Sequence, residues 1–82
     1  MIITFIKDDF YAGCDIILSF EVLEDGYALN SIESLGFSKY FIENNFIDIQ
    51  IFKELINQKV VLSKYQMLQL TYIHDFREAN NK

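Results

Sequence analysis

Residues 14–29 decide the fold of this chain, and their sequence is CDIILSFEVLEDGYAL. Apolar side chains at positions 16, 18, 20 and 22 alternate with a mixed set at 15, 17, 19 and 21. This period of two predicts a strand over 14–23 with one continuously buried face. Residues 24–26, Glu-Asp-Gly, supply a turn because an Asp-Gly pair tolerates positive φ, and residues 27–29 are expected to return as a short third strand.

The N-terminal segment supplies another strand. Residues 1–6 are rich in β-branched side chains, which predicts a strand that pairs antiparallel with residues 14–23. The connection over 7–13 is long for a hairpin. The chain is therefore expected to begin with a small antiparallel sheet.

The pattern changes after residue 30 and becomes helical. Asn30 or Ser31 is expected to cap a short helix over 32–35. Ser38 is expected to cap another turn or two as far as residue 42.

Residues 46–58 form the next predicted helix. Ile47, Ile51 and Leu55 recur at four-residue spacing, which is typical of a helix with one buried stripe. Residues 46–51 also alternate between apolar and polar side chains, so a strand remains an alternative for that stretch.

The last predicted element begins at a capping box. Ser63 is followed three residues later by Gln66, and in this arrangement each side chain binds the backbone N–H of the other residue. The helix is expected to run to about Glu78. The side chains of its predicted buried stripe are Tyr65, Leu68, Tyr72 and Phe76. Three more apolar residues lie outside that stripe: Met67, Leu70 and Ile73. The helix is therefore either packed between other elements or offers a second apolar strip to a partner subunit.

These elements predict an α+β fold in a single small domain over residues 1–82. An N-terminal antiparallel sheet of two or three strands is expected over 1–30. Two or three helices over 31–79 are expected to cover one face of that sheet, and 80–82 to fray. Hydrophobic residues make up 51% of the 82 residues, so some apolar side chains are expected at the surface, where an oligomer or a partner would cover them.

The sequence also predicts a cytoplasmic location in a bacterial or phage-infected cell. The single cysteine, Cys14, cannot form an internal disulfide and is expected to be a small buried hydrophobe. No stretch approaches the roughly 20 apolar residues of a membrane span, and the N-terminus lacks the pattern of a signal peptide. Abundant Ile, Phe, Asn, Tyr and Lys without Pro or Trp are typical of AT-rich coding DNA, as in low-GC bacteria and their phages.

Residues suited to catalysis or metal binding are scarce. The single imidazole, His74, has Glu78 four residues on, which is half of a metal site at best, and no Ser or Cys signature surrounds it. The adjacent acids at 8–9 and 24–25 point in different directions and are explained by turns. The sequence therefore predicts no enzyme, no catalytic residue, no metal and no cofactor.

Direct nucleic-acid binding is not expected. Residues 46–58 and the helix after Ser63 superficially resemble a helix-turn-helix, but a recognition helix there would offer only Lys64, Gln66 and Gln69. The phosphate contacts that dominate affinity require a basic surface, and the isoelectric point of this chain is about 4.6.

Charge is unevenly distributed along the chain. No Lys or Arg occurs between residues 8 and 38, and residues 1–41 hold seven acids and two bases, which accounts for the whole net charge of −5. On the strand over 14–23, Asp15 and Glu21 share the outward face about 20 Å apart, and further acids lie in the loops at both ends. This predicts an acidic rim around a partly apolar strip that includes Ile17 and Leu23.

Such a surface is expected to dock on a basic surface of a partner protein by charge steering and aromatic anchoring. The predicted contact residues are Asp8, Asp9, Asp15, Glu21, Glu24, Asp25, Phe10, Tyr11 and Tyr27. A nucleic-acid-binding protein is a suitable partner, so the hypothesis is an inhibitor of a nucleic-acid-processing defence complex, of the kind that phages and mobile elements carry. Two alternatives remain. One is a homo-oligomeric structural or assembly protein that uses the apolar face of the last helix, and the other is an immunity or antitoxin protein against a basic toxin.

Overall fold

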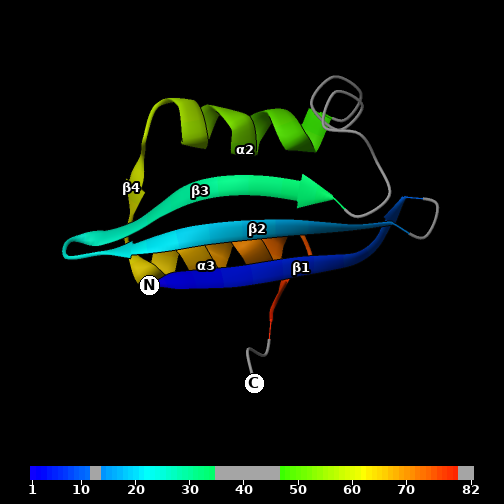
Figure 1. The fold of residues 1–82 in the computed structure, drawn as a ribbon, viewed down its shortest axis with the longest axis horizontal. Helices are drawn as coiled ribbons and strands as arrows, with labels where there is room; N and C mark the ends of the chain where they lie inside the picture. The colour runs from blue at the N-terminus through cyan, green and yellow to red at the C-terminus, as the bar shows by residue number, and fades with distance from the viewer. Residues whose placement is uncertain (12–13, 35–46, 80–82) are drawn as a thin grey trace.

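The computed structural model describes residues 1–11, 14–34 and 47–79. Three long strands come first along the chain: β1 (Ile2–Tyr11), β2 (Cys14–Leu23) and β3 (Gly26–Ser34). Each pairs antiparallel with the next (Figure 1). Leu18 at the centre therefore lies between Phe5 and Ile32. The predicted antiparallel pairing of the first two strands is confirmed, and the turn predicted over 24–26 occupies residues 24–25, with Gly26 as the first residue of β3.

The sheet is larger than the sequence predicts. Two short strands from the second half, β4 (Val61–Leu62) and β5 (Arg77–Glu78), pair with β3 and β1 and become its edges. The result is a curled antiparallel sheet of five strands in the order β4-β3-β2-β1-β5. The predicted fold class, two or three strands packed against two or three helices, is therefore wrong, because strands outnumber the two helices of the described residues. Two-residue strands carry no alternating pattern, so they form only by pairing with an existing edge.

The two described helices are α2 (Ile47–Asn57) and α3 (Lys64–Ile73). α2 is the helix predicted over 46–58, so the alternative of a strand is excluded from residue 47 onward. α3 begins at the predicted capping box. Ser63 Oγ accepts a hydrogen bond from the backbone N–H of Gln66 at 3.1 Å, and Gln66 Oε1 accepts one from the N–H of Ser63 at 2.9 Å. Neither of these described helices is long and apolar enough to cross a membrane.

α3 ends earlier than predicted. Asp75 takes a left-handed φ of 64°, its N–H donates to the carbonyl of Tyr72, and the N–H of Phe76 donates to the carbonyl of Thr71. These are the two hydrogen bonds of a Schellman motif, which ends a helix. The predicted continuation to Glu78 is therefore wrong, because the chain turns at Asp75 and enters β5.

α2 ends in the same way. Lys59 takes a left-handed φ of 52°, its N–H donates to the carbonyl of Ile56, and the N–H of Val60 donates to the carbonyl of Leu55. The left-handed residue of this motif is usually glycine, but here it is a lysine, and after α3 it is an aspartate. The usual sequence signal of a helix end is therefore missing at both places.

α3 connects the two edges of the sheet. β4 precedes the helix and β5 follows it, and between them α3 runs along the sheet behind β1 and β2 (Figure 1).

The core lies between the sheet and the two helices. Its buried residues are Phe5, Ile16, Leu18, Phe20, Leu29, Ile49, Phe52, Met67, Thr71 and Phe76. Two pairs of aromatic rings pack edge to face in this core. The ring centroids of Phe5 and Phe20, on β1 and β2, are 5.7 Å apart, and those of Phe52 and Phe76 are 5.6 Å apart. The even positions of β2 thus face the helices, and the odd positions face away.

α3 buries a different face from the predicted one. Met67 and Thr71 are buried, whereas Tyr65 and Tyr72 of the predicted stripe are 73% and 58% exposed. Thr71 Oγ1 donates to the carbonyl of Met67 at 3.1 Å, which satisfies this hydroxyl inside the core. The helical period is ambiguous in the sequence because apolar residues occupy most of the circumference.

β3 is longer than the short third strand that the sequence predicts. It continues through Ser34, so the short helix predicted over 32–35 is wrong at residues 32–34. The register of β3 with β2 shifts at Asn30, where a bulge inserts one extra residue. Residue 35 and the short helix predicted from Ser38 to residue 42 lie outside the described residues.

Candidate functional site

The candidate site is the side of the sheet that faces away from the core, which we call the outer face. Successive side chains along a strand point to opposite faces of the sheet, so the residues that precede and follow each buried residue belong to the outer face. Its residues on β1, β2 and β3 are Ile2, Thr4, Ile6, Asp8, Asp15, Ile17, Ser19, Glu21, Leu23, Ala28, Asn30, Ser31 and Glu33. Within the described part of the chain, both helices pack on the opposite side, where their buried residues join the core (Figure 1).

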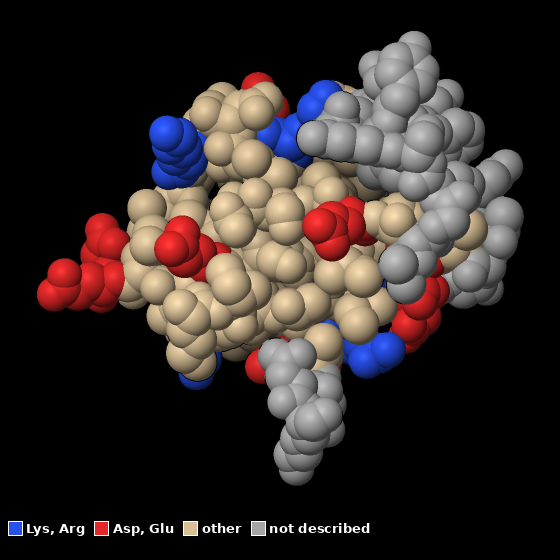
Figure 2. Space-filling view, in the orientation of Figure 1, with Lys and Arg blue, Asp and Glu red and all other residues tan. Residues whose placement is uncertain are grey.

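Acids are spread over the outer face. The outer-face acids are Asp8, Asp15, Glu21 and Glu33. Glu24 and Asp25 are exposed in the turn at one end of the sheet. Asp15 and Glu21 are six residues apart on one strand, a separation of about 20 Å. Figure 2 shows acidic groups spaced over a largely uncharged surface, with basic groups at its margins. The acids therefore surround apolar side chains instead of forming one cluster.

One of these acids is paired with a base from the second half of the chain. Arg77 Nε lies 2.7 Å from Asp8 Oδ2, and Arg77 Nη2 lies 3.1 Å from Asp8 Oδ1. This hydrogen-bonded pair lowers the pKa of the Asp8 carboxyl and, with a further contribution from the charge of Asp15, raises the pKa of Arg77. Part of the predicted acidic surface is therefore neutralised at this end, and Asp8 links β5 to β1.

The predicted acids at the other end remain exposed. Glu21, Glu24 and Asp25 make no ion pair with another described residue. Glu33, which is absent from the predicted contact set, joins Asp15 and Glu21 on the outer face opposite Ile17. It was missed because residues 32–35 were expected to be helical. Simple alternation from Tyr27 and Leu29 would also have placed it on the inner face, since the bulge at Asn30 shifts the phase of β3.

The predicted aromatic anchors do not come together on the outer face. Tyr27 pairs with Val22 and Leu62 and packs half-buried against the core, so it faces the other way. The side chains of residues 9–11, which include the predicted contacts Asp9, Phe10 and Tyr11, lie outside the described residues.

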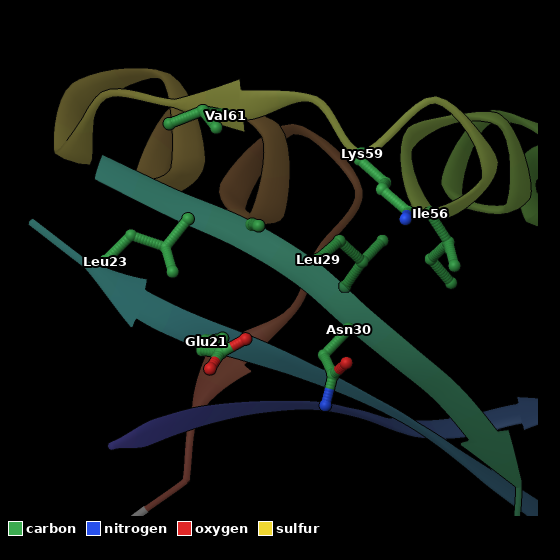
Figure 3. A pocket seen from close by; sticks show the side chains of 8 residues that line it. Glu21, Leu23, Leu29, Asn30, Ile56, Lys59 and Val61 are labelled. Carbon is green, nitrogen blue, oxygen red and sulfur yellow. The ribbon is translucent and has the colours of Figure 1, made fainter. Parts of the chain in front are cut away.

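A groove of about 380 Å³ lies at the β3–β4 side of the outer face (Figure 3). The residues that line it are Glu21, Leu23, Ala28, Leu29, Asn30, Ile56, Lys59 and Val61. Its lining is mostly aliphatic, with Glu21 and Asn30 from the sheet and Lys59 from the end of α2 as the polar groups. Figure 3 shows Glu21 and Lys59 on opposite sides of Leu29, so the groove has an acidic and a basic end.

The residues suited to catalysis or metal binding are dispersed. Within residues 1–11, 14–34 and 47–79, no group of three His, Cys, Asp or Glu side chains is placed to hold a metal ion. His74 caps the end of α3 and packs half-buried against Phe52 with ring centroids 5.2 Å apart, while Glu78 belongs to β5. The two residues therefore do not share a helical turn. Cys14 is half-buried at the start of β2.

Comparison of the chain with protein-family models, with curated proteins and with solved structures gives no match. Function is therefore inferred from what the outer face offers chemically. It presents carboxylates, hydroxyls and aliphatic side chains, which suit the recognition of cationic and apolar groups on another molecule.

Proposed function

We propose that the outer face docks on a basic surface of a partner protein, and that this non-enzymatic binding is the function of the chain. The observation that carries the proposal is the presence of exposed acids around aliphatic side chains on one face of the sheet. An antiparallel sheet often leaves one face to water, but that face is then normally polar. Here Ile6, Ile17 and Leu23 lie among the acids, a composition typical of a surface that a partner covers.

The spacing of the acids favours ordinary protein–protein docking. It does not resemble the regular phosphate spacing that a protein imitating DNA would need. Each strand of DNA places one phosphate charge about every 3.4 Å along the helix axis. Asp15 and Glu21 are about 20 Å apart on one strand, with Ile17 and Ser19 between them and Glu33 beside Ile17 on the next strand. Such sparse charges steer a basic protein into register, while the apolar contacts between them supply most of the binding free energy.

The groove beside Glu21 is suited to one long basic side chain of the partner. The aliphatic stem of a Lys or Arg would pack on Leu23 and Leu29, and its cationic head would meet the Glu21 carboxylate. Lys59 at the other end would repel a cationic head placed there. The groove would therefore accept the basic side chain in one orientation, with its head at Glu21.

Proteins that bind nucleic acids carry the kind of basic surface that the outer face would occupy. By covering that surface, this chain would inhibit its partner, as expected for an inhibitor of a nucleic-acid-processing complex. An immunity protein against a basic toxin would use the same physics and would differ only in the partner.

The test is a pair of variants that change the net charge equally on different sides. Glu21→Gln with Glu33→Gln removes two charges from the outer face. Glu54→Gln with Asp75→Asn removes two exposed charges from the helical side. The partner is recovered from native lysate with the wild-type protein as bait and identified, and its dissociation constant is then measured for each variant across a salt series.

We expect the outer-face pair to weaken binding about tenfold at low salt and the helical-side pair to have little effect. The difference should shrink as salt screens the charges. Equal affinity for all three proteins, or equal losses for both pairs, would refute the proposal. If the partner binds nucleic acid, the wild-type protein should also displace that nucleic acid, and a basic toxin as the partner would favour the immunity role.

A further inference from the structure

An uncharged strip runs along the exposed side of α3. Tyr65, Tyr72 and Ile73 are 73%, 58% and 68% exposed, and Gln66 and Gln69 lie between them. At 100° per residue, these five positions fall within about 120° of the helix circumference, on the side opposite its buried residues. We call these five residues the α3 strip.

The apolar surface continues from the α3 strip into a groove between the helices. This groove has a volume of about 270 Å³. The residues that line it are Ile51, Leu55, Leu62, Gln66, Gln69, Leu70 and Ile73. Ile51 of α2 is 43% exposed, so both helices contribute to one apolar area on the side of the molecule away from the outer face.

We propose that a second copy of this chain docks on the α3 strip, so that two copies form a two-fold symmetric dimer. The charge pattern selects this occupant. The chain has a net charge of −5, yet the α3 strip contains no acid, so two equally charged copies can meet there without opposing carboxylates. A basic partner would find no carboxylate to bind on this strip. A nucleic acid would find no cluster of cations, because Lys64 is the one charged residue of α3.

The order of residues along the α3 strip is self-complementary when two copies of the helix pack antiparallel. With Gln69 at the two-fold axis, Tyr65 of each copy faces Tyr72 and Ile73 of the other copy. Every contact then occurs twice, as an isologous interface requires. Aromatic residues are also the type most enriched at the centres of interfaces.

The charges that flank the α3 strip are complementary in the same arrangement. Lys64 precedes the strip and Asp75 follows it, and both side chains are exposed. Antiparallel packing places the end of the strip that carries Lys64 against the end of the other copy that carries Asp75, whereas parallel packing would place like-charged ends together. The flanking pair therefore favours the antiparallel register.

The size of the surface predicts a weak dimer. A ten-residue helix is about 15 Å long, and a standard interface buries about 800 Å² on each partner. The α3 strip needs the neighbouring groove to approach that area. Association should therefore depend on concentration, and its equilibrium should respond to single substitutions in the strip.

Sedimentation or light scattering over a dilution series of the full chain tests the proposal. The apparent mass of the wild-type protein should rise toward twice the monomer mass as concentration increases. Ile73→Lys should remain a monomer, because a dimer would bury two added charges. Asn57→Lys, which makes the same change of net charge on an exposed position of α2 away from the groove, should associate like the wild type.

Cross-linking tests separately whether the α3 strip lies at the interface. In a Cys14→Ser background, Gln69→Cys should form covalent dimers with a short bis-maleimide, and Asn57→Cys should not. Circular dichroism of each variant checks that it is folded. A wild-type chain that stays monomeric at the highest concentration, or an Ile73→Lys variant that associates like Asn57→Lys, would overturn the dimer. Equal cross-linking at both cysteines would overturn the placement of the α3 strip at the interface. These outcomes do not depend on the outer face or its partner.

Discussion

At the level of single residues, the contact between Asp8 and Arg77 shows why a candidate site is only partly predictable from sequence. Alternation along β2 is a local property, so the sequence alone is enough to place Asp15 and Glu21 on one side of the strand. Arg77 is 69 residues away from Asp8 and comes beside it because β5 pairs with β1. No local pattern predicts that pairing, and the neutralisation of one acid was therefore missed.

The ion pair predicts a pH dependence of stability. The pKa of Asp8 is lowered in the folded protein, chiefly by its hydrogen bond to Arg77. Its contribution is therefore fully present above the ordinary carboxyl pKa of about 3.9 and is lost as the pH falls through the lowered native value. Asp8→Asn should lower the unfolding midpoint slightly at pH 7, since the pair is exposed, and this difference should narrow below about pH 4. Thermal unfolding of both proteins from pH 7 to pH 2 measures it. A difference in unfolding midpoint that stays constant from pH 7 to pH 2 would contradict this explanation.

Gly26 gives a second prediction for a single residue. It has φ of 155°, and a Cβ atom there would lie 2.4 Å from the carbonyl oxygen of Leu62 and 2.8 Å from Cγ1 of Val61. Both neighbours belong to β4, so relief would require the edge strand to move. Gly26→Ala should lower the free energy of unfolding by about 2 kcal/mol in urea denaturation. Asp25→Ala, at the preceding turn residue, is the control and should cost less; equal losses would show that contact with β4 is not the cause.

At the level of helices and strands, beginnings were more predictable than ends. The start of α3 depends on two side chains three residues apart, so the sequence contains it. Its end depends on a left-handed residue, and Asp75 lacks the signal that a glycine would give. β4 and β5 lacked any signal, because each consists of two residues held by a neighbouring strand.

Placing glycine at the left-handed residue after α3 should stabilise the protein. A left-handed conformation costs an L-residue about 1–2 kcal/mol, and glycine avoids that cost while adding freedom to the unfolded chain. Asp75→Gly should therefore raise the free energy of unfolding by about 0.5–1 kcal/mol. Glu54→Gly, at an exposed position inside α2, is the control and should lower it by about 1 kcal/mol. Chemical denaturation compares the two, and a loss at both positions would argue against the left-handed end of α3.

At the level of the whole molecule, the two proposed surfaces lie on opposite sides. The outer face points away from the helices, and the α3 strip points away from the sheet. A dimer through α3 would therefore leave both outer faces accessible and directed apart. Such a dimer would bridge two partner molecules and could not place both outer faces on one flat surface.

Mass action links the dimer to thermal stability. If the folded dimer dissociates into unfolded monomers on heating, its midpoint rises with protein concentration. For a chain of this length, the average enthalpy of unfolding gives a rise of at most about 4 °C for each tenfold increase in concentration, reached when the dimer is fully populated before it unfolds. The wild-type protein and the Glu21→Gln, Glu33→Gln variant should both show this rise, because neither changes the α3 strip. Ile73→Lys should have a midpoint independent of concentration while it keeps its affinity for a partner of the outer face. Loss of both properties in one variant would mean that the two surfaces are not independent.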